Sequence, residues 1–139
     1  MDYHFNYSYI WRHFGRLING LILSLELAFI SILIGALIGI ILTLLYVDKG
    51  KLFKTFITCY VELIRNSPLL LLVYLVFYGI PSMGGVEYSA TTSFIITLSV
   101  YSGAYLVEVF RSGLSAVPQG LIDAGKSIGM NYYQRLIYI

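Results

Sequence analysis

The stretch LILSLELAFISILIGALIGIILTLLYV, from Leu21 to Val47, decides what kind of protein this is. It contains one acidic residue, Glu26, and no lysine, arginine or proline. A helix of about 20 apolar residues is enough to cross the hydrocarbon core of a bilayer, and this stretch has 27 residues. A cleaved signal core has only about 7–15 residues and ends at a small-residue cleavage site, which is missing here. The stretch therefore predicts a permanent membrane span, over about residues 17–47.

Two further apolar stretches follow and predict spans over about residues 52–80 and 89–117. The first of them is interrupted at Pro68, which is expected to kink or break its helix. Of all residues 58% are hydrophobic and 12% are charged, whereas soluble domains have about a quarter charged residues. Because an α-helix satisfies its own backbone hydrogen bonds in lipid, the sequence predicts an all-α membrane protein.

Basic residues are unevenly distributed over the connections between these stretches. Three lysines lie within residues 48–54, whereas residues 81–87 contain no lysine or arginine. Connections rich in lysine and arginine face the cytoplasm, so the first connection is expected inside and residues 81–87 outside. Residues 1–16 then form an external N-terminal segment. Arg12 and Arg16 argue against this orientation, but the three lysines outweigh them.

Four of the charged residues inside the apolar stretches form pairs three positions apart. Glu62 precedes Arg65 and Glu108 precedes Arg111, so each pair could neutralise itself on one helix face. Ionisable groups within spans usually face a partner or a cavity. The structural alternative is therefore local pairing or extension of the charged groups to the membrane interface, and the functional alternative is a path for a zwitterionic or charged solute. The functional hypothesis assigns that path to Glu62, Arg65, Tyr105 and Glu108, with further hydroxyls from Tyr101 and Ser102.

Small residues recur every four positions in the first stretch, at Ser31, Gly35 and Gly39. This spacing places them on one helix face, where small side chains let a second helix approach closely in lipid. The pattern predicts that this face packs against another span.

The sequence contains no arrangement typical of a catalytic or metal centre. Both histidines, His4 and His13, lie in the N-terminal segment, and Cys59 is the only cysteine. No phosphate-binding Gly-x-x-x-x-Gly-Lys-Ser/Thr loop is present, so any ATP hydrolysis must come from another chain. We therefore expect no enzyme, no cofactor and no metal, and the net charge of +2 does not indicate a nucleic-acid partner.

Two motifs resemble the permease subunits of ABC importers, in particular the polar amino-acid uptake family. Residues 60–70 read YVELIRNSPLL, similar to the family's Tyr-x-Glu-x-x-Arg-Gly-Thr-Pro-Leu-Leu. The second motif has Asp123-Ala124-Gly125, three residues, Gly129 and nine residues before Ile139. The family pattern is Glu-Ala-Ala, three residues, Gly, nine residues and Ile-x-Leu-Pro. Departures at positions 66, 67, 123 and 125 are chemically mild.

The resemblance implies a type I ABC importer transmembrane domain of the MetI-like class. Such a permease has five spans, of which residues 17–139 would supply three, followed by a cytoplasmic coupling segment at 118–131 and the start of a fourth span at 132–139. Coupling to the ATPase is assigned to Asp123, Ala124, Gly125 and Gly129. The implied function is import of amino acids, polar ones in particular, by alternating access in a bacterial cytoplasmic (inner) membrane. The implied partners are two ABC ATPase subunits, an extracytoplasmic solute-binding protein and a second permease, either this chain or a sister.

Physical reasoning gives each coupling residue a role. A carboxylate at Asp123, near the start of a helix expected over residues 121–128, would complement the helix dipole. Small residues at 124 and 125 would let a partner surface approach the backbone. Gly129 is expected to adopt a positive φ that ends the helix. One alternative remains open, a proton-coupled secondary transporter that uses Glu26, Glu62 or Glu108. Another is a membrane scaffold that transports nothing.

Overall fold

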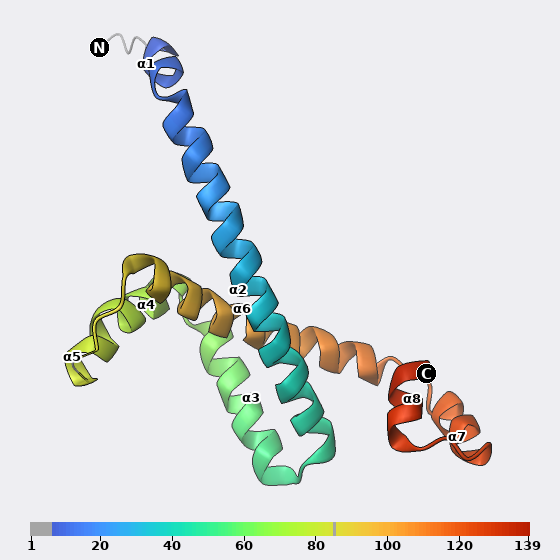
Figure 1. Cartoon of the computed structure of the whole chain (residues 1–139). Helices are drawn as coiled ribbons and strands as arrows, with labels where there is room; N and C mark the ends of the chain where they lie inside the picture. The colour runs from blue at the N-terminus through green and yellow to red at the C-terminus, as the bar shows by residue number, and fades with distance from the viewer. Residues whose placement is uncertain (1–6, 85) are drawn as a thin grey trace, which may run out of the picture.

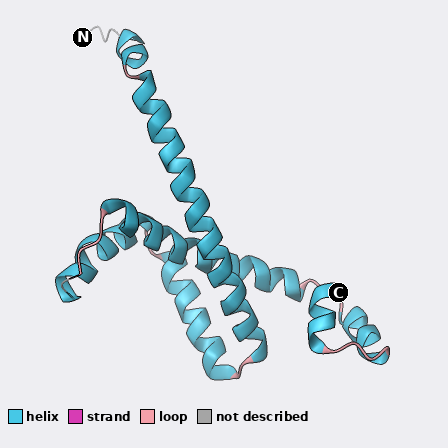
Figure 2. Ribbon diagram, viewed as in Figure 1, coloured by secondary structure: helices cyan, strands magenta, loops and turns pink. Residues whose placement is uncertain are grey.

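The computed structural model describes residues 7–84 and 86–139, and every regular element in that part of the chain is helical (Figures 1 and 2). The prediction of an all-α chain is therefore confirmed for the described residues. In chain order the elements are α1 (Tyr7–Arg12), α2 (Phe14–Asp48), α3 (Lys51–Asn66), α4 (Leu69–Tyr74), the π-helix η1 (Leu75–Gly79), α5 (Ile80–Gly84), α6 (Ala90–Ser115), α7 (Gln119–Ser127) and α8 (Tyr132–Tyr138).

Helix α2 is the longest element and organises the others. It has 35 residues, which at 1.5 Å per residue gives a length of about 52 Å. Its N-terminal half projects away from α3–α8 and carries α1 at its tip, and its C-terminal half packs on α3 and α6 (Figure 1). Both α2 and α6 are long and apolar enough to cross a membrane. Helix α2 covers the stretch predicted as the first span, and α6 covers most of the third.

The small-residue stripe of α2 packs against α6, as its spacing predicts. Ser31, Gly35 and Gly39 are all buried there, and the same face continues to the buried Thr43, which the sequence analysis did not single out. A Cβ atom added at Gly39 would lie 2.9 Å from the Cβ of Leu106. The two backbones can come this close only because these positions carry no larger side chain.

The second apolar stretch is not one straight helix. Helix α3 ends at Asn66, and the following arm, Leu69–Gly84, is bent by 106° relative to it. The break lies at Pro68, which has no N–H to continue the ladder, and the preceding Ser67 is extended (φ −91°, ψ 138°) as residues before proline prefer. The arm comprises α4, η1 and α5. Residues 81–84, expected in a connection, are helical in α5, and Gly85 lies outside the described residues.

Two buried clusters hold α3 and α4 against α6. Ile57 and Val61 of α3 contact Val107 of α6 in the first cluster. In the second, Ile64 and Leu72 pack around Ala104 of α6. Tyr60 borders both clusters, and its hydroxyl donates a hydrogen bond of 2.7 Å to the backbone carbonyl of Val100.

The hydroxyl of Tyr60 is expected to contribute modestly to stability. Side-chain hydrogen bonds between membrane helices average about 0.6 kcal/mol, with a maximum near 1.7 kcal/mol. Tyr60→Phe should therefore lower the free energy of unfolding in detergent by about 1 kcal/mol, because the ring still packs and only the bond to Val100 is lost. Tyr74→Phe removes a hydroxyl from an exposed ring on α4 and is the matched control. Equal melting temperatures for wild type and Tyr60→Phe would contradict the assignment.

Candidate functional site

A polar cavity of about 360 Å³ lies between α3 and α6. Its lining includes all four residues that the functional hypothesis names. Its lining is Thr58, Val61, Glu62, Arg65, Asn66, Tyr105, Glu108 and Arg111. The side chains of α3 reach it from one helix face because residues 58, 62 and 66 are four positions apart and residue 65 is three positions after 62. Residues 105, 108 and 111 share a face of α6 for the same reason.

Glu108 is the centre of this cluster and accepts contacts from two arginines. Its Oε2 lies 3.5 Å from Nη1 of Arg65 on α3, and its Oε1 accepts a 3.2 Å hydrogen bond from Nη2 of Arg111. The three side chains are about one-third exposed in this chain. The expected pairing of Glu108 with Arg111 is confirmed. Arg65 pairs across to α6 instead of with Glu62, so local pairing of Glu62 with Arg65 was wrong.

Glu62 faces the cavity without an ion pair among the described residues. The reason is geometric, since Arg65 extends toward Glu108 and stacks over the ring of Tyr105 at 5.0 Å. A guanidinium over an aromatic face is favourable, and more so away from water. The cluster thus leaves one carboxylate available at its edge.

The hydroxyls expected at the cavity behave differently from one another. The Tyr105 ring lines the cavity, and its hydroxyl lies 3.1 Å from that of Tyr101. Ser102 does not belong to the lining. Its Oγ donates to the backbone carbonyl of Ser31 on α2 at 3.3 Å, so it serves helix packing and its expected place in the cavity was wrong.

Helix α7 forms a separate element beyond the end of α6, next to α8 (Figure 1). Pro118 immediately precedes its first residue, and Gly129 follows it with φ +81°, which confirms the predicted positive φ. The amide of Met130 donates to the carbonyl of Gly125 at 3.0 Å, and that of Gly129 donates to Lys126 at 3.0 Å. These two bonds are a Schellman cap, which needs a left-handed residue at the position of Gly129.

Asp123 does not lie in the first turn of this helix. Helix α7 begins at Gln119, because Pro118 suits a helix start, and Asp123 is therefore in its middle. Its Oδ1 accepts hydrogen bonds from Nζ of Lys126 at 3.0 Å and from Nε2 of Gln119 at 3.1 Å. These two bonds, that from Lys126 above all, hold the pKa of Asp123 below its ordinary value. The predicted dipole role of Asp123 was wrong, and the carboxylate instead cross-links its own helix.

Ala124 and Gly125, both expected to face a partner, differ in their exposure. Ala124 is exposed, as an approach surface requires, whereas Gly125 is buried against α8 of the same chain. A Cβ atom at Gly125 would lie 2.6 Å from Cδ1 of Ile139 and 3.4 Å from the Arg135 side chain. The missing side chain at Gly125 therefore lets α8 of the same chain pack closely against α7. The expectation that Gly125 lets a partner protein approach was wrong.

Comparison with known proteins places the chain in a family of transport proteins. Residues 31–139 match the family described as the binding-protein-dependent transport system inner membrane component. The chain belongs to this family. Its curated relatives include two from Bacillus subtilis (strain 168). The probable glutamine ABC transporter permease protein GlnP is 35% identical over 95% of this chain and 60% of its own length. The probable amino-acid ABC transporter permease protein YckA is 31% identical over 97% of this chain and 59% of its own length.

A solved structure of the same type agrees with the fold. The chain superposes with a TM-score of 0.87, at 30% identity, on a structure titled "Crystal structure of an amino acid ABC transporter with histidines". That match covers 98% of this chain and 63% of the solved one. The predicted type I ABC importer transmembrane fold is thereby confirmed, and the chain spans about 60% of the length of the curated relatives. The proton-coupled alternative has no support from these permeases.

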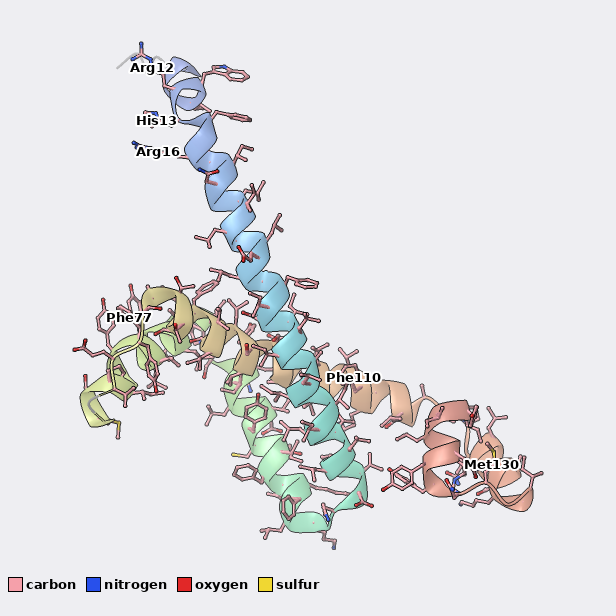
Figure 3. The ribbon with its side chains drawn as sticks, viewed as in Figure 1. Arg12, His13, Arg16, Phe77, Phe110 and Met130 are labelled. Carbon is pink, nitrogen blue, oxygen red and sulfur yellow. The ribbon has the colours of Figure 1, made fainter. Side chains whose placement is uncertain are left out.

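The sequence analysis did not single out Tyr46, whose ring lies against the side chains of two basic residues. The Tyr46 ring near the end of α2 lies 5.1 Å from Cζ of Arg111 and 5.7 Å from Nζ of Lys54. Its only signal in the sequence is its place at the end of a span, where tyrosines are common for interfacial reasons. By contrast Arg12, the last residue of α1, and Arg16, near the start of α2, lie at the opposite end of α2 from Tyr46 (Figure 3).

Proposed function

We propose that the chain acts in the membrane-spanning unit of an ATP-driven importer that carries polar amino acids across a bacterial cytoplasmic membrane. The observation that carries this proposal is the cavity between α3 and α6, where two carboxylates and two guanidiniums line about 360 Å³. Charged groups inside spans are expensive and mark solute paths in many transporters. Membership of the permease family supports the same reading.

The charge balance of the cavity suits a zwitterion. A free amino acid carries a carboxylate and an ammonium a few ångströms apart. Arg65 offers a planar donor pair for the carboxylate, and Glu62, which has no ion pair in the described part of the chain, offers an acceptor for the ammonium. Glu108 would release Arg65 as the solute binds. The names of the relatives, glutamine and amino-acid permeases, point to the same class of substrate.

Energy for the cycle would come from a separate ATPase that docks on α7. This helix carries Ala124 on an exposed surface, and its end is fixed by the cap at Gly129. The rigid cap supports transmission, because a movement of the partner displaces the helix as a whole. Asp123, Ala124 and Gly129 are proposed as coupling residues, with Gly125 holding α8 in place. Two ATPase subunits, a solute-binding protein outside and a second permease, either this chain or a sister, complete the proposed assembly.

The proposed orientation follows the lysines. The connection between α2 and α3, which contains Lys49, and the start of α3 at Lys51 lie inside with α7, and the segment before α2 lies outside. The charged cavity then lies between a cytoplasmic element that receives energy and an external side that receives solute.

Uptake should fall when the cavity loses a carboxylate. Glu108→Gln leaves Arg65 and Arg111 without their shared anion, and Glu62→Gln removes the available acceptor. Each change is expected to lower uptake of the transported amino acid by about ten-fold or more, the effect of roughly 1.4 kcal/mol. The measurement is uptake of radiolabelled amino acids by vesicles that contain the assembled transporter, normalised to permease abundance.

Glu26→Gln is the matched control, because Glu26 is exposed on α2 and does not line the cavity. It should leave uptake unchanged. Normal uptake in both cavity variants would return Glu62 and Glu108 to purely structural roles. Uptake that continues without ATP and collapses with a protonophore would refute the importer proposal itself.

A further inference from the structure

A second cavity, of about 570 Å³, lies where the end of α2, the start of α3, the end of α6 and the helices α7 and α8 meet. Most of its wall is apolar, with Leu114 of α6 and Leu136 of α8 among its lining residues. This volume is within the usual range of sites that enclose a ligand, about 300–1,000 Å³. The proposed solute path does not require this cavity.

Its charged lining residues are all cations. Lys54, Arg111 and Arg135 line the cavity, and no aspartate or glutamate does. Arg111 is shared with Glu108, but Lys54 and Arg135 form no ion pair within the described residues. The cavity therefore has an uncompensated positive charge, which costs free energy unless an anion or water approaches it.

The cations are also held in place. Nη1 of Arg135 donates a 2.6 Å hydrogen bond to the backbone carbonyl of Met130. The Tyr46 ring lies under both Lys54 and Arg111, at 5.7 Å and 5.1 Å. Anchored donors lose little side-chain entropy when an anion binds, so this arrangement is organised in advance for a ligand.

We propose that this cavity binds the phosphate headgroup of an anionic phospholipid, with an acyl chain along the apolar wall. The cations suit a phosphate, since arginine donates to its oxygens in pairs and lysine acts as a point charge. Basic pockets between membrane helices are known to hold such headgroups. The cavity is at the depth where headgroups lie, because Val47 is the last apolar residue of α2 and the lysine-rich connection follows.

The test is a lipid titration followed by native mass spectrometry of the purified full-length protein in detergent. Phosphatidylglycerol should bind as a discrete adduct, and phosphatidylcholine should bind more weakly. Each basic residue near a membrane surface contributes an approximately five-fold factor in binding. Lys54→Gln should therefore weaken phosphatidylglycerol binding about five-fold.

Lys51→Gln is the matched control, because it removes the same charge from the same helix but does not line the cavity. Arg135→Gln should weaken binding about five-fold too, and if it disturbs α8 then Lys54→Glu, an exposed change with a stronger expected loss, replaces it. Equal binding of the two lipids, or equal losses in Lys51→Gln and Lys54→Gln, would overturn the proposal. Displacement of phosphatidylglycerol by millimolar inorganic phosphate would assign the site to a soluble anion and overturn the lipid source.

Discussion

Replacing Gly35 by valine is expected to lower the yield of folded protein strongly. A Cβ atom at this position would lie 3.0 Å from the backbone nitrogen of Gly103 and would collide with the side chain of Ser102. Ser102 could turn aside, but the backbone at Gly103 cannot, so α2 and α6 would have to separate. Overpacking a close contact costs about 1–3 kcal/mol for a few added carbons. The loss here should be at the upper end, since both buried clusters depend on α6 staying in place.

The measurement is the yield of monodisperse protein after size-exclusion chromatography in detergent. Gly20→Val on the same helix is the control, because a Cβ atom at Gly20 would meet nothing within 4 Å. Both changes place the same β-branched residue in a helix, so a difference between them reports the contact with α6. A normal yield for Gly35→Val would mean that α2 and α6 do not pack as described.

Gly129→Asp is the second change with a large expected effect, on coupling and not on insertion. With φ +81° this position lies in the left-handed region, where a side chain costs on the order of 1 kcal/mol. Within this chain a Cβ atom at Gly129 would meet nothing within 4 Å, so steric damage can arise only against a partner. On the proposed ATPase contact, an added carboxylate without a counter-charge costs several kcal/mol more. Transport should be abolished and the ATPase should bind more weakly.

Two control variants distinguish the effect of backbone strain at position 129 from the effect of the added negative charge. Gly129→Asn tolerates the left-handed conformation and adds no charge, so most coupling should survive. Gly50→Asp adds the same charge at the lysine-rich end, at an extended helix start that favours aspartate, and should be harmless. Co-purification with the ATPase and uptake in vesicles are the measurements. Wild-type uptake with a bound ATPase in Gly129→Asp would remove α7 from the coupling pathway.

Residue spacing in the sequence correctly predicted those features that depend only on residues close together in the chain. The stripe through Gly35 and Gly39 indicated a packed face, and the glycine at 129 indicated a left-handed helix end, because both depend on a few neighbouring residues. Arg65 could not be assigned in this way. Its partner, Glu108, is 43 positions away and depends on how α3 lies against α6.

Boundaries and bends were the other source of error. Pro68 signalled an interruption, but the angle of 106° depends on the packing of Leu72 against Ala104, which no local pattern contains. The start of α7 at Gln119, two residues before the expected start, was enough to move Asp123 out of the first turn. The sequence analysis assigned Gly125 to a contact with a partner protein. Its actual neighbour is Ile139 of the same chain, and this contact could not be predicted because it depends on how α8 folds back.

The π-helix η1 has a consequence for comparing this chain with its relatives. A π-turn holds one residue more than an α-turn, so Leu75–Gly79 behaves as a single-residue insertion in an otherwise α-helical arm. Deleting one residue there would restore ordinary α-turns and leave the faces of α5 pointing almost as before, because the wider π-turn already absorbs the extra residue. In a sequence alignment, a one-residue gap within 75–79 would therefore be harmless to the arm as such. Beyond that gap, aligned residues of α5 would point in the same directions in both chains, so their chemistry can be compared position by position.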